Sequence, residues 1–311
     1  MHAHHTKVLP KSWLAFDLNV LKRFKFSSVS IPFSSSPALG SYVKRWDARV
    51  LANDTLRSSW VKNIAEIGNN GQRLSEDEVE IILQDAYVPG YKLSNPALAS
   101  WFSETDSWWF DNVRRNIERL DSQMSQCIAS AIALSVGDYA LSFKGEAREL
   151  RQPLSSAFRR LRSIHPEAYD NRQENTCTNK PSDDFLAETP ADLMLLRLPS
   201  AHAQETKSYL GRSAWAEEWL RGGNDFWEEF DSKNAGRLGA ATETKSQYLH
   251  LLEETLRRAS HIRNWAVAHV ETGFITTQDI TDTIAQIRRV DTIYTKDFSE
   301  LTGAKAVIIT A

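Results

Sequence analysis

The sequence is poor in cysteine, has no long apolar run and carries little net charge, and each absence narrows the function. Its 311 residues include two cysteines, Cys127 and Cys177, too few for a disulfide framework or a metal-type cluster. We therefore expect a reducing, cytoplasmic location. No apolar run approaches the roughly 20 residues that span a bilayer, and the first residues lack the apolar core of a signal peptide, so we expect no membrane association.

Charge and catalytic signatures exclude further classes. The formal net charge of -3 argues against a protein held to nucleic acid by bulk charge, although a local basic groove stays open. There is no P-loop and no G-x-S-x-G elbow. Five histidines raise the question of metal binding or catalysis, but a frayed N-terminus explains the first three better, and packing or surface positions explain the other two. We predict no metal site at these histidines: His2, His4, His5, His202 and His269.

Tryptophan, in contrast, is abundant. Ten are present, and two groups recur at helical spacing: Trp101, Trp108 and Trp109, then Trp215, Trp219 and Trp227. Such groups usually pack in a core or between domains, and base stacking is the alternative interpretation.

Hydrophobic periodicity predicts an α/β protein interrupted by helices. Residues 1–70 contain two short apolar runs around a helix, the opening of a nucleotide-binding sheet. Residues 71–184 are mostly helical in pattern, with a polar loop or linker over 165–190. In residues 185–311 strands return, and the last two resemble an antiparallel hairpin that closes a mixed sheet. We therefore predict one Rossmann-like sheet built from both ends of the chain, with 71–184 as a helical insertion.

Three segments near the N-terminus resemble motifs of the Dam-like class of adenine-specific DNA methyltransferases. "HTKVLP" is similar to the opening G-x-K-x-x-L-x-P, with Lys7 at the lysine. "IPFSSSPALGSYVKR" is similar to P-F-x-G-x-G-A followed by a helix, with Phe33 at the phenylalanine. "VLAND" is similar to a strand that ends in Asn-Asp, with Asp54 at the acidic position.

Three later segments follow in the order of the same class. "WWFDNVRRNIERL" and then "SAIALSVGDYAL" resemble a helical pair. "ADLMLLRLPS" falls where the class has D-L-V-Y-x-D-P-P-Y, and "AVAHVETGFIT" falls where it has S-Y-R-S-x-G-x-P-S, with Gly273 retained. The resemblance implies a Rossmann-like methyltransferase sheet that binds S-adenosylmethionine (AdoMet), and a target-recognition region for double-stranded DNA at 71–184.

The segment that would bind AdoMet departs from the family pattern. Ser35 and Pro37 stand at its two glycine positions, where glycine would let the cofactor approach the backbone without meeting a Cβ. Pro37 also has no N–H to donate. We therefore favour a surface turn over a working cofactor loop, so that AdoMet binding is weak or lost. Asp54 stays a candidate acceptor for the ribose hydroxyls, with a loop aspartate as the alternative.

The segment that would carry catalysis departs further. The resemblance implies a flipped adenine whose amino hydrogen is accepted by the acid of D-P-P-Y, while the tyrosine stacks on the base. Here Arg197 stands at the acid, Leu198 and Pro199 at the prolines, and Ser200 at the tyrosine. Arginine only donates hydrogen bonds and stays charged. Loss of one oriented group from a preorganised site costs about 3–4 kcal/mol of transition-state stabilisation, so we predict that the site is inactive.

Three hypotheses about function remain. The leading one is a non-catalytic relative that keeps a DNA-binding cleft or acts as a partner subunit beside an active methyltransferase, with Arg197 suited to a phosphate contact. The second is an active AdoMet-dependent DNA adenine methyltransferase with an unorthodox site, in which Glu205 or, less favourably, Asp192 replaces the acid. The third is a protein-interaction module whose contact surface is the tryptophan-rich helices.

Overall fold

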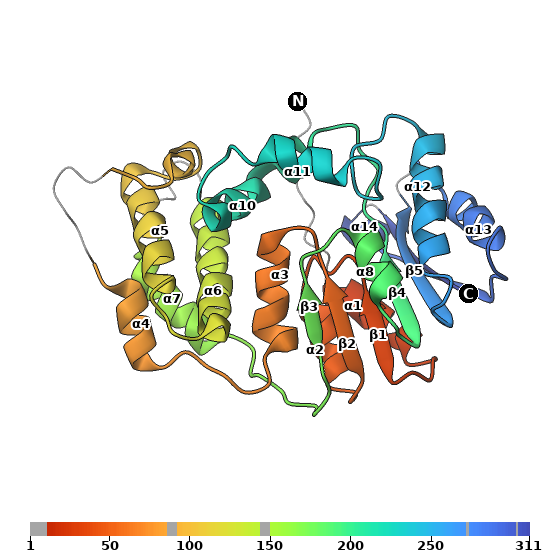
Figure 1. Ribbon diagram of the computed structural model, residues 1–311, viewed down its shortest axis with the longest axis horizontal. Helices are drawn as coiled ribbons and strands as arrows, with labels where there is room; N and C mark the ends of the chain where they lie inside the picture. The colour runs from red at the N-terminus through yellow and green to blue at the C-terminus, as the bar shows by residue number, and fades with distance from the viewer. Residues whose placement is uncertain (1–10, 86–91, 144–149, 272–273, 303) are drawn as a thin grey trace.

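The protein is described by a computed structural model in which an α/β region and a group of helices lie side by side (Figure 1). The structure describes residues 11–85, 92–143, 150–271, 274–302 and 304–311. The predicted α/β class, with a mixed sheet, is confirmed.

A sheet of seven strands organises the described part of the α/β region. Its strands are β1 (Ser28–Ile31), β2 (Arg49–Asn53), β3 (Thr176–Thr178), β4 (Leu193–Arg197), β5 (Asn264–Glu271), β6 (Thr292–Asp297) and β7 (Lys305–Thr310). Their order is β3-β2-β1-β4-β5-β7-β6. The first five run parallel to their neighbours, and β7 is antiparallel to both β5 and β6. The predicted terminal hairpin is therefore present.

Helices cover both faces of this sheet, which explains why its inner strands are almost continuously apolar. Side chains of α1 (Lys11–Leu21) and α2 (Ala38–Lys44) pack on one face. On the other face lie α8 (Ser182–Glu188), α12 (Lys245–Arg258) and α13 (Thr277–Ala285). The strand pattern of β4 alternates between the two clusters, so that Leu195 faces the first and Leu196 the second.

The second group of helices has its own hydrophobic core. It contains α4 (Glu76–Leu83), α5 (Glu104–Ile117), α6 (Gln123–Ser142) and α7 (Leu154–Ser163), with α3 (Arg57–Asn63) and the π-helix Ile64–Gly68 on its side toward the sheet. Ser75 forms a capping box with Glu78 at the start of α4, and α6 is largely buried.

A long connection between β4 and α12 crosses back over the sheet to these helices. It contains α9 (Thr206–Leu210), α10 (Ala214–Arg221) and α11 (Trp227–Asn234). Trp215 and Trp219 of α10 are 0% and 1% exposed in the helical core. The indole N–H groups of Trp101 and Trp227 both donate to the buried Glu218. These tryptophans therefore pack against other residues and do not form an exposed contact surface. The last helix, α14 (Ser299–Thr302), precedes β7.

The expectation of a loop or linker over 165–190 is wrong in two places. Thr176–Thr178 forms β3, which pairs with β2, and Ser182–Glu188 forms α8. Three residues that we predicted to lie in the helical insertion, Thr176–Thr178, therefore belong to the sheet. β3 is short and polar, so its pairing comes from the buried strand beside it. The Asn53 side chain bonds to Thr178 and Lys180 and holds the segment there.

Among the helices described, none is long and apolar enough to cross a bilayer.

Candidate functional site

The carboxyl ends of β1 and β4 form the place where a ligand is expected. In an open parallel sheet, ligands bind outside the carboxyl ends at the point where the strand order reverses. Here β1 is flanked by β2 on one side and β4 on the other, so that point lies between β1 and β4. The segments that the resemblance assigns to cofactor and catalysis, residues 32–37 and 197–200, follow these two strands.

The chain's own backbone covers this place. We call residues 235–243, which connect α11 to α12, the covering segment. A Cβ built on Gly239 would lie 3.5 Å from both a ring carbon of Phe33 and Cγ of Pro199, so the segment contacts both loops. Gly239 has φ +95°, which favours glycine. Leu238 beside it is 3% exposed and packs in the cluster that contains Leu198.

Hydrogen bonds hold the covering segment to the loop after β4. The Thr242 N–H donates to the carbonyl of His202 at 2.7 Å. His202 Nε2 lies 3.3 Å from the carbonyl of Gly239, and its ring stacks on Tyr209 with centroids 3.7 Å apart. His202 therefore has the packing role that its sequence context favours.

The turn after β1 is tied to α3. The Ser34 hydroxyl donates to Oδ1 of Asn63 at 3.0 Å, and the Asn63 amide donates back to the Ser34 carbonyl at 2.7 Å. Ser35 is exposed, whereas Pro37 is buried and immediately precedes α2 with φ -70°. Such a turn supplies no glycine and, at Pro37, no N–H for a cofactor.

Asp54 follows β2 and is 6% exposed. Its Oδ1 accepts the N–H of Leu56 at 2.9 Å, the local bond that aspartate makes in a turn before a helix. Burial raises the pKa of Asp54 to about 7, the Leu56 N–H opposes that rise, and the nearby carboxylate of Glu217 adds to it. This geometry fits a turn aspartate better than an open acceptor for ribose hydroxyls.

The pKa of Asp54 predicts a pH dependence of stability. Unfolded aspartate titrates near pH ~3.9, whereas the pKa in the folded protein is about 7. The folded state therefore keeps a proton that the unfolded state has released, and stability falls as pH rises from about 4 to about 7. Asp54→Asn removes this loss, so the variant should gain about 2–4 kcal/mol on wild type across that range. Urea denaturation at each pH measures the difference.

Asp192→Asn is the matched control, because hydrogen bonds from Ser27 lower the pKa of Asp192. Its stability relative to wild type should change in the acid range and stay constant near neutral pH. A constant difference between Asp54→Asn and wild type from pH 4 to 7 would contradict the raised pKa.

Arg197, the last residue of β4, is joined to the chain's own carboxylate. Its Nη2 donates to Oδ2 of Asp17 on α1. The side chains are 21% exposed for Arg197 and 3% for Asp17. Burial raises the pKa of Asp17, and the Arg197 guanidinium opposes that rise. A phosphate that contacts Arg197 would therefore have to compete with the internal ion pair to Asp17. Sequence reasoning missed Asp17, because α1 carries none of the motifs.

Leu198, Pro199 and Ser200, which follow Arg197, line a small pocket. The Leu198 N–H donates to Ala268 and extends the pairing with β5, and the Pro199 carbonyl accepts the Tyr248 hydroxyl at 2.8 Å. The pocket measures about 50 Å³, room for a few water molecules. Its lining residues are Leu198, Pro199, Ser200, Ala201, Tyr248, His269, Val270, Phe274 and Ile275.

His269 is the titratable ring of this pocket, and burial lowers its pKa. Its Nε2 lies 3.1 Å from the carbonyl of Ile275, so the neutral ring has a structural partner. Ser200 is exposed and carries no ring that could stack on a base. The pocket thus lies at the segment that the resemblance assigns to catalysis, and its lining contains no acid.

Neither candidate substitute acid reaches this pocket lining. Oδ2 of Asp192 accepts from Ser27 N at 2.8 Å, Ser27 Oγ at 2.6 Å and Ser28 N at 3.1 Å, which places it at the amino ends of β4 and β1. Asp192 therefore lies at the opposite end of β4 from Arg197. Glu205 is exposed just before α9. Lys7 and Gly273, like His2, His4 and His5, lie outside the described residues.

Comparison with known proteins leaves the resemblance at the level of motifs. No protein-family model matches the sequence, and no curated protein matches it.

Proposed function

We propose that this chain is a catalytically inactive relative of the Dam-like adenine-specific DNA methyltransferases and that it binds double-stranded DNA. One observation carries the loss of activity. Arg197, at the position of the family's acid, is bonded to the buried Asp17. A guanidinium cannot accept a hydrogen from the adenine amino group, and here its charge serves the packing of α1 against β4.

The strand order supports the relationship to methyltransferases. It is the Rossmann order 3-2-1-4-5-6 with one further strand, β7, placed antiparallel between β5 and β6. The chain leaves the sheet after β2, forms the helical region and returns to the sheet at β3. The resemblance implies a target-recognition region in this part of the chain.

The covering segment supports the loss of AdoMet. A cofactor between β1 and β4 would have to displace Leu238 and Gly239 from Phe33 and Pro199. Displacement would expose Leu238, whose burial contributes roughly 1.5–3 kcal/mol.

AdoMet binding and methyl transfer are the direct tests of inactivity. AdoMet titrated into the protein in a calorimeter should give no binding heat, and radiolabelled AdoMet should leave no label on adenine-containing DNA. Arg197→Asp together with Asp17→Asn should not restore transfer, because Ser200 and the covering segment are unchanged. Micromolar AdoMet affinity, or label that disappears when residues 197–200 are altered, would support the enzyme hypothesis instead.

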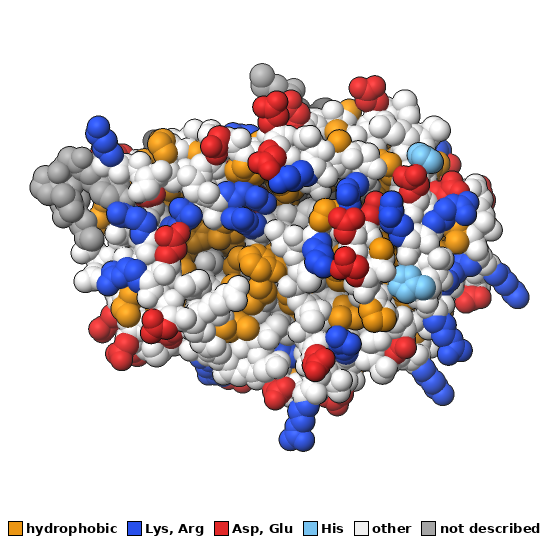
Figure 2. All heavy atoms as spheres, viewed as in Figure 1, with side chains coloured by type: hydrophobic (Ala, Val, Ile, Leu, Met, Phe, Trp, Pro, Cys, Tyr) orange, Lys and Arg blue, Asp and Glu red, His pale blue; other side chains and the backbone are white. Residues whose placement is uncertain are grey.

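The charge distribution supports DNA binding despite the negative net charge. Figure 2 shows hydrophobic side chains gathered on the face over α3 and α6, with Lys and Arg side chains above them. Mobility shift of duplex DNA should show binding that weakens steeply between low and moderate salt, since each phosphate contact releases counterions. Absence of binding at low salt would reject the DNA role and leave a protein partner.

A further inference from the structure

Three arginines from three helices meet beside the start of α3. Arg57 is its first residue, Arg114 lies on α5, and Arg221 ends α10. The N–H of Arg57 and Nε of Arg221 both donate to Oε2 of Glu217, each at 3.1 Å. A Cβ built on Gly222, the residue after Arg221, would lie 2.8 Å from Nη1 of Arg114. The charges of Arg221 and Arg114 also act on the Arg57 guanidinium, so the three groups lie near one another.

Two of these guanidinium groups are held in place by the surrounding side chains. Arg221 is bonded to Glu217 and lies over the rings of Phe226 and Phe230, 4.6 and 5.4 Å from their centroids. Arg114 pairs with Glu118 at 3.2 Å. Cation–π contact and ion pairing orient both groups in advance of any ligand.

Arg57 differs from the other two in its freedom. Its side chain is exposed, and within the described residues no hydrogen bond or ion pair engages its guanidinium, because the bond to Glu217 comes from its backbone. Partial burial lowers the pKa of Arg57, repulsion from Arg221 and Arg114 lowers it further, and the Glu217 carboxylate opposes this fall. An anion placed among the three groups would relieve that repulsion.

The acids near the group all have basic partners. Glu118 pairs with Arg114. Glu229 pairs with Lys233 and also lies near Arg221, whose charge helps to lower the pKa of Glu229. Glu217 is fully buried, and its oxygens are used by the N–H groups of Arg57 and Ser58 and by Arg221. It therefore positions the arginines from beneath. Phosphate oxygens are acceptors that match the donor geometry of guanidinium.

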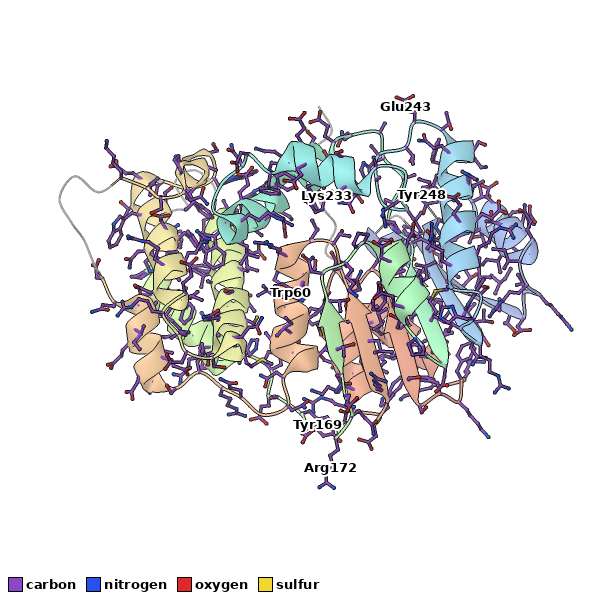
Figure 3. The ribbon with its side chains drawn as sticks, in the orientation of Figure 1. Trp60, Tyr169, Arg172, Lys233, Glu243 and Tyr248 are labelled. Atoms are coloured by element: carbon purple, nitrogen blue, oxygen red, sulfur yellow. The ribbon has the colours of Figure 1, made fainter. Side chains whose placement is uncertain are left out.

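The surroundings of the arginines favour a nucleic acid over a small anion. Trp60 lies three residues after Arg57, on the same face of α3. Its indole N–H donates to the Cys177 carbonyl at 3.1 Å, which fixes the ring at the edge of the sheet. Figure 3 shows Trp60 near the middle of the molecule, between the sheet and the helical group. A polymer that spans both regions would pass the arginines and this ring together.

We propose that Arg57, Arg114 and Arg221 bind a backbone phosphate of DNA that lies across the face over α3 and α6. This inference rests on the proposed DNA-binding function and names the residues that carry it. Arg57 supplies the free donor, and the other two supply fixed positive charge.

Substitution of Arg57 tests the site. Arg57→Gln should weaken binding of a fluorescent duplex about 10- to 100-fold at moderate salt, the range expected for one charged hydrogen bond. The slope of log affinity against log salt should fall by about 1, the loss of one phosphate contact. Arg57→Lys should keep the slope and lose part of the affinity, because the charge stays and the planar donor pair is lost.

Arg172→Gln is the control for net charge. Arg172 is exposed and lies at the bottom of the view, well below Trp60 (Figure 3). Its substitution should leave affinity and slope unchanged, and all variants should share the circular dichroism spectrum of wild type. If wild type binds DNA but Arg57→Gln behaves like Arg172→Gln, the phosphate site is rejected and the DNA-binding function stands. If wild type does not bind even at low salt, both are rejected.

Discussion

Asp17→Ala should lower the free energy of unfolding by about 3 kcal/mol, because it leaves the Arg197 guanidinium at the end of β4 without its partner. The Asp17 side chain is 3% exposed and that of Arg197 is 21% exposed, so water replaces the lost carboxylate poorly. Urea denaturation at neutral pH measures the change. The same ion pair predicts that Arg197→Asp alone is destabilising, since it sets a second carboxylate against Asp17.

Two variants make this expectation specific. Replacement of both partners, Asp17→Leu with Arg197→Met, should recover most of the lost stability, because a buried ion pair can be exchanged for apolar packing. Asp184→Ala removes the carboxylate of a more exposed ion pair, in which the Asp184 side chain is 49% exposed and the Arg237 side chain is 28% exposed. It should cost less than about 1 kcal/mol. Equal losses of unfolding free energy in Asp17→Ala and Asp184→Ala would show that the ion pair at β4 contributes no more to stability than an exposed pair.

Gly137→Ala should destabilise the helical region by about 3 kcal/mol or more. A Cβ on Gly137 of α6 would lie 2.1 Å from two ring carbons of Trp215, far inside van der Waals contact. The Trp215 ring cannot yield easily, because it is 0% exposed and packs against Phe102 and Phe110 with centroids 5.3 and 5.4 Å away. Overpacking of such a core costs about 1–3 kcal/mol and sometimes more. Thermal unfolding and urea denaturation report the effect.

Gly71→Ala provides the control, because nothing lies within 4 Å of a Cβ there. It should change stability by less than about 0.5 kcal/mol. Trp215→Leu in the Gly137→Ala background should cost less than Trp215→Leu in wild type, since the smaller side chain relieves the clash. Strict additivity of the two substitutions would contradict close packing of α6 on α10.

Most of the secondary structure followed from local pattern, and its failures have one physical cause. β1, β2, β4 and β5 are short apolar runs, so burial alone predicts them. β3 has the sequence Thr-Cys-Thr and forms because it pairs with β2. α8 begins with Ser-Asp-Asp and forms because its later residues, Phe185 and Leu186, pack with α12. Tertiary contact decided both elements, and periodicity could not detect them.

The sequence by itself determined which chemistry the chain lacks: position 197 has no acceptor, position 200 has no ring, and position 37 has no N–H. These are properties of single side chains and hold in any fold. Only the tertiary structure decided what those positions do. It joined Arg197 to a carboxylate 180 residues away, set Leu238 and Gly239 over the ends of β1 and β4, and brought three arginines from separate helices together. Contacts between distant residues depend on how the elements pack, and local sequence does not encode that packing.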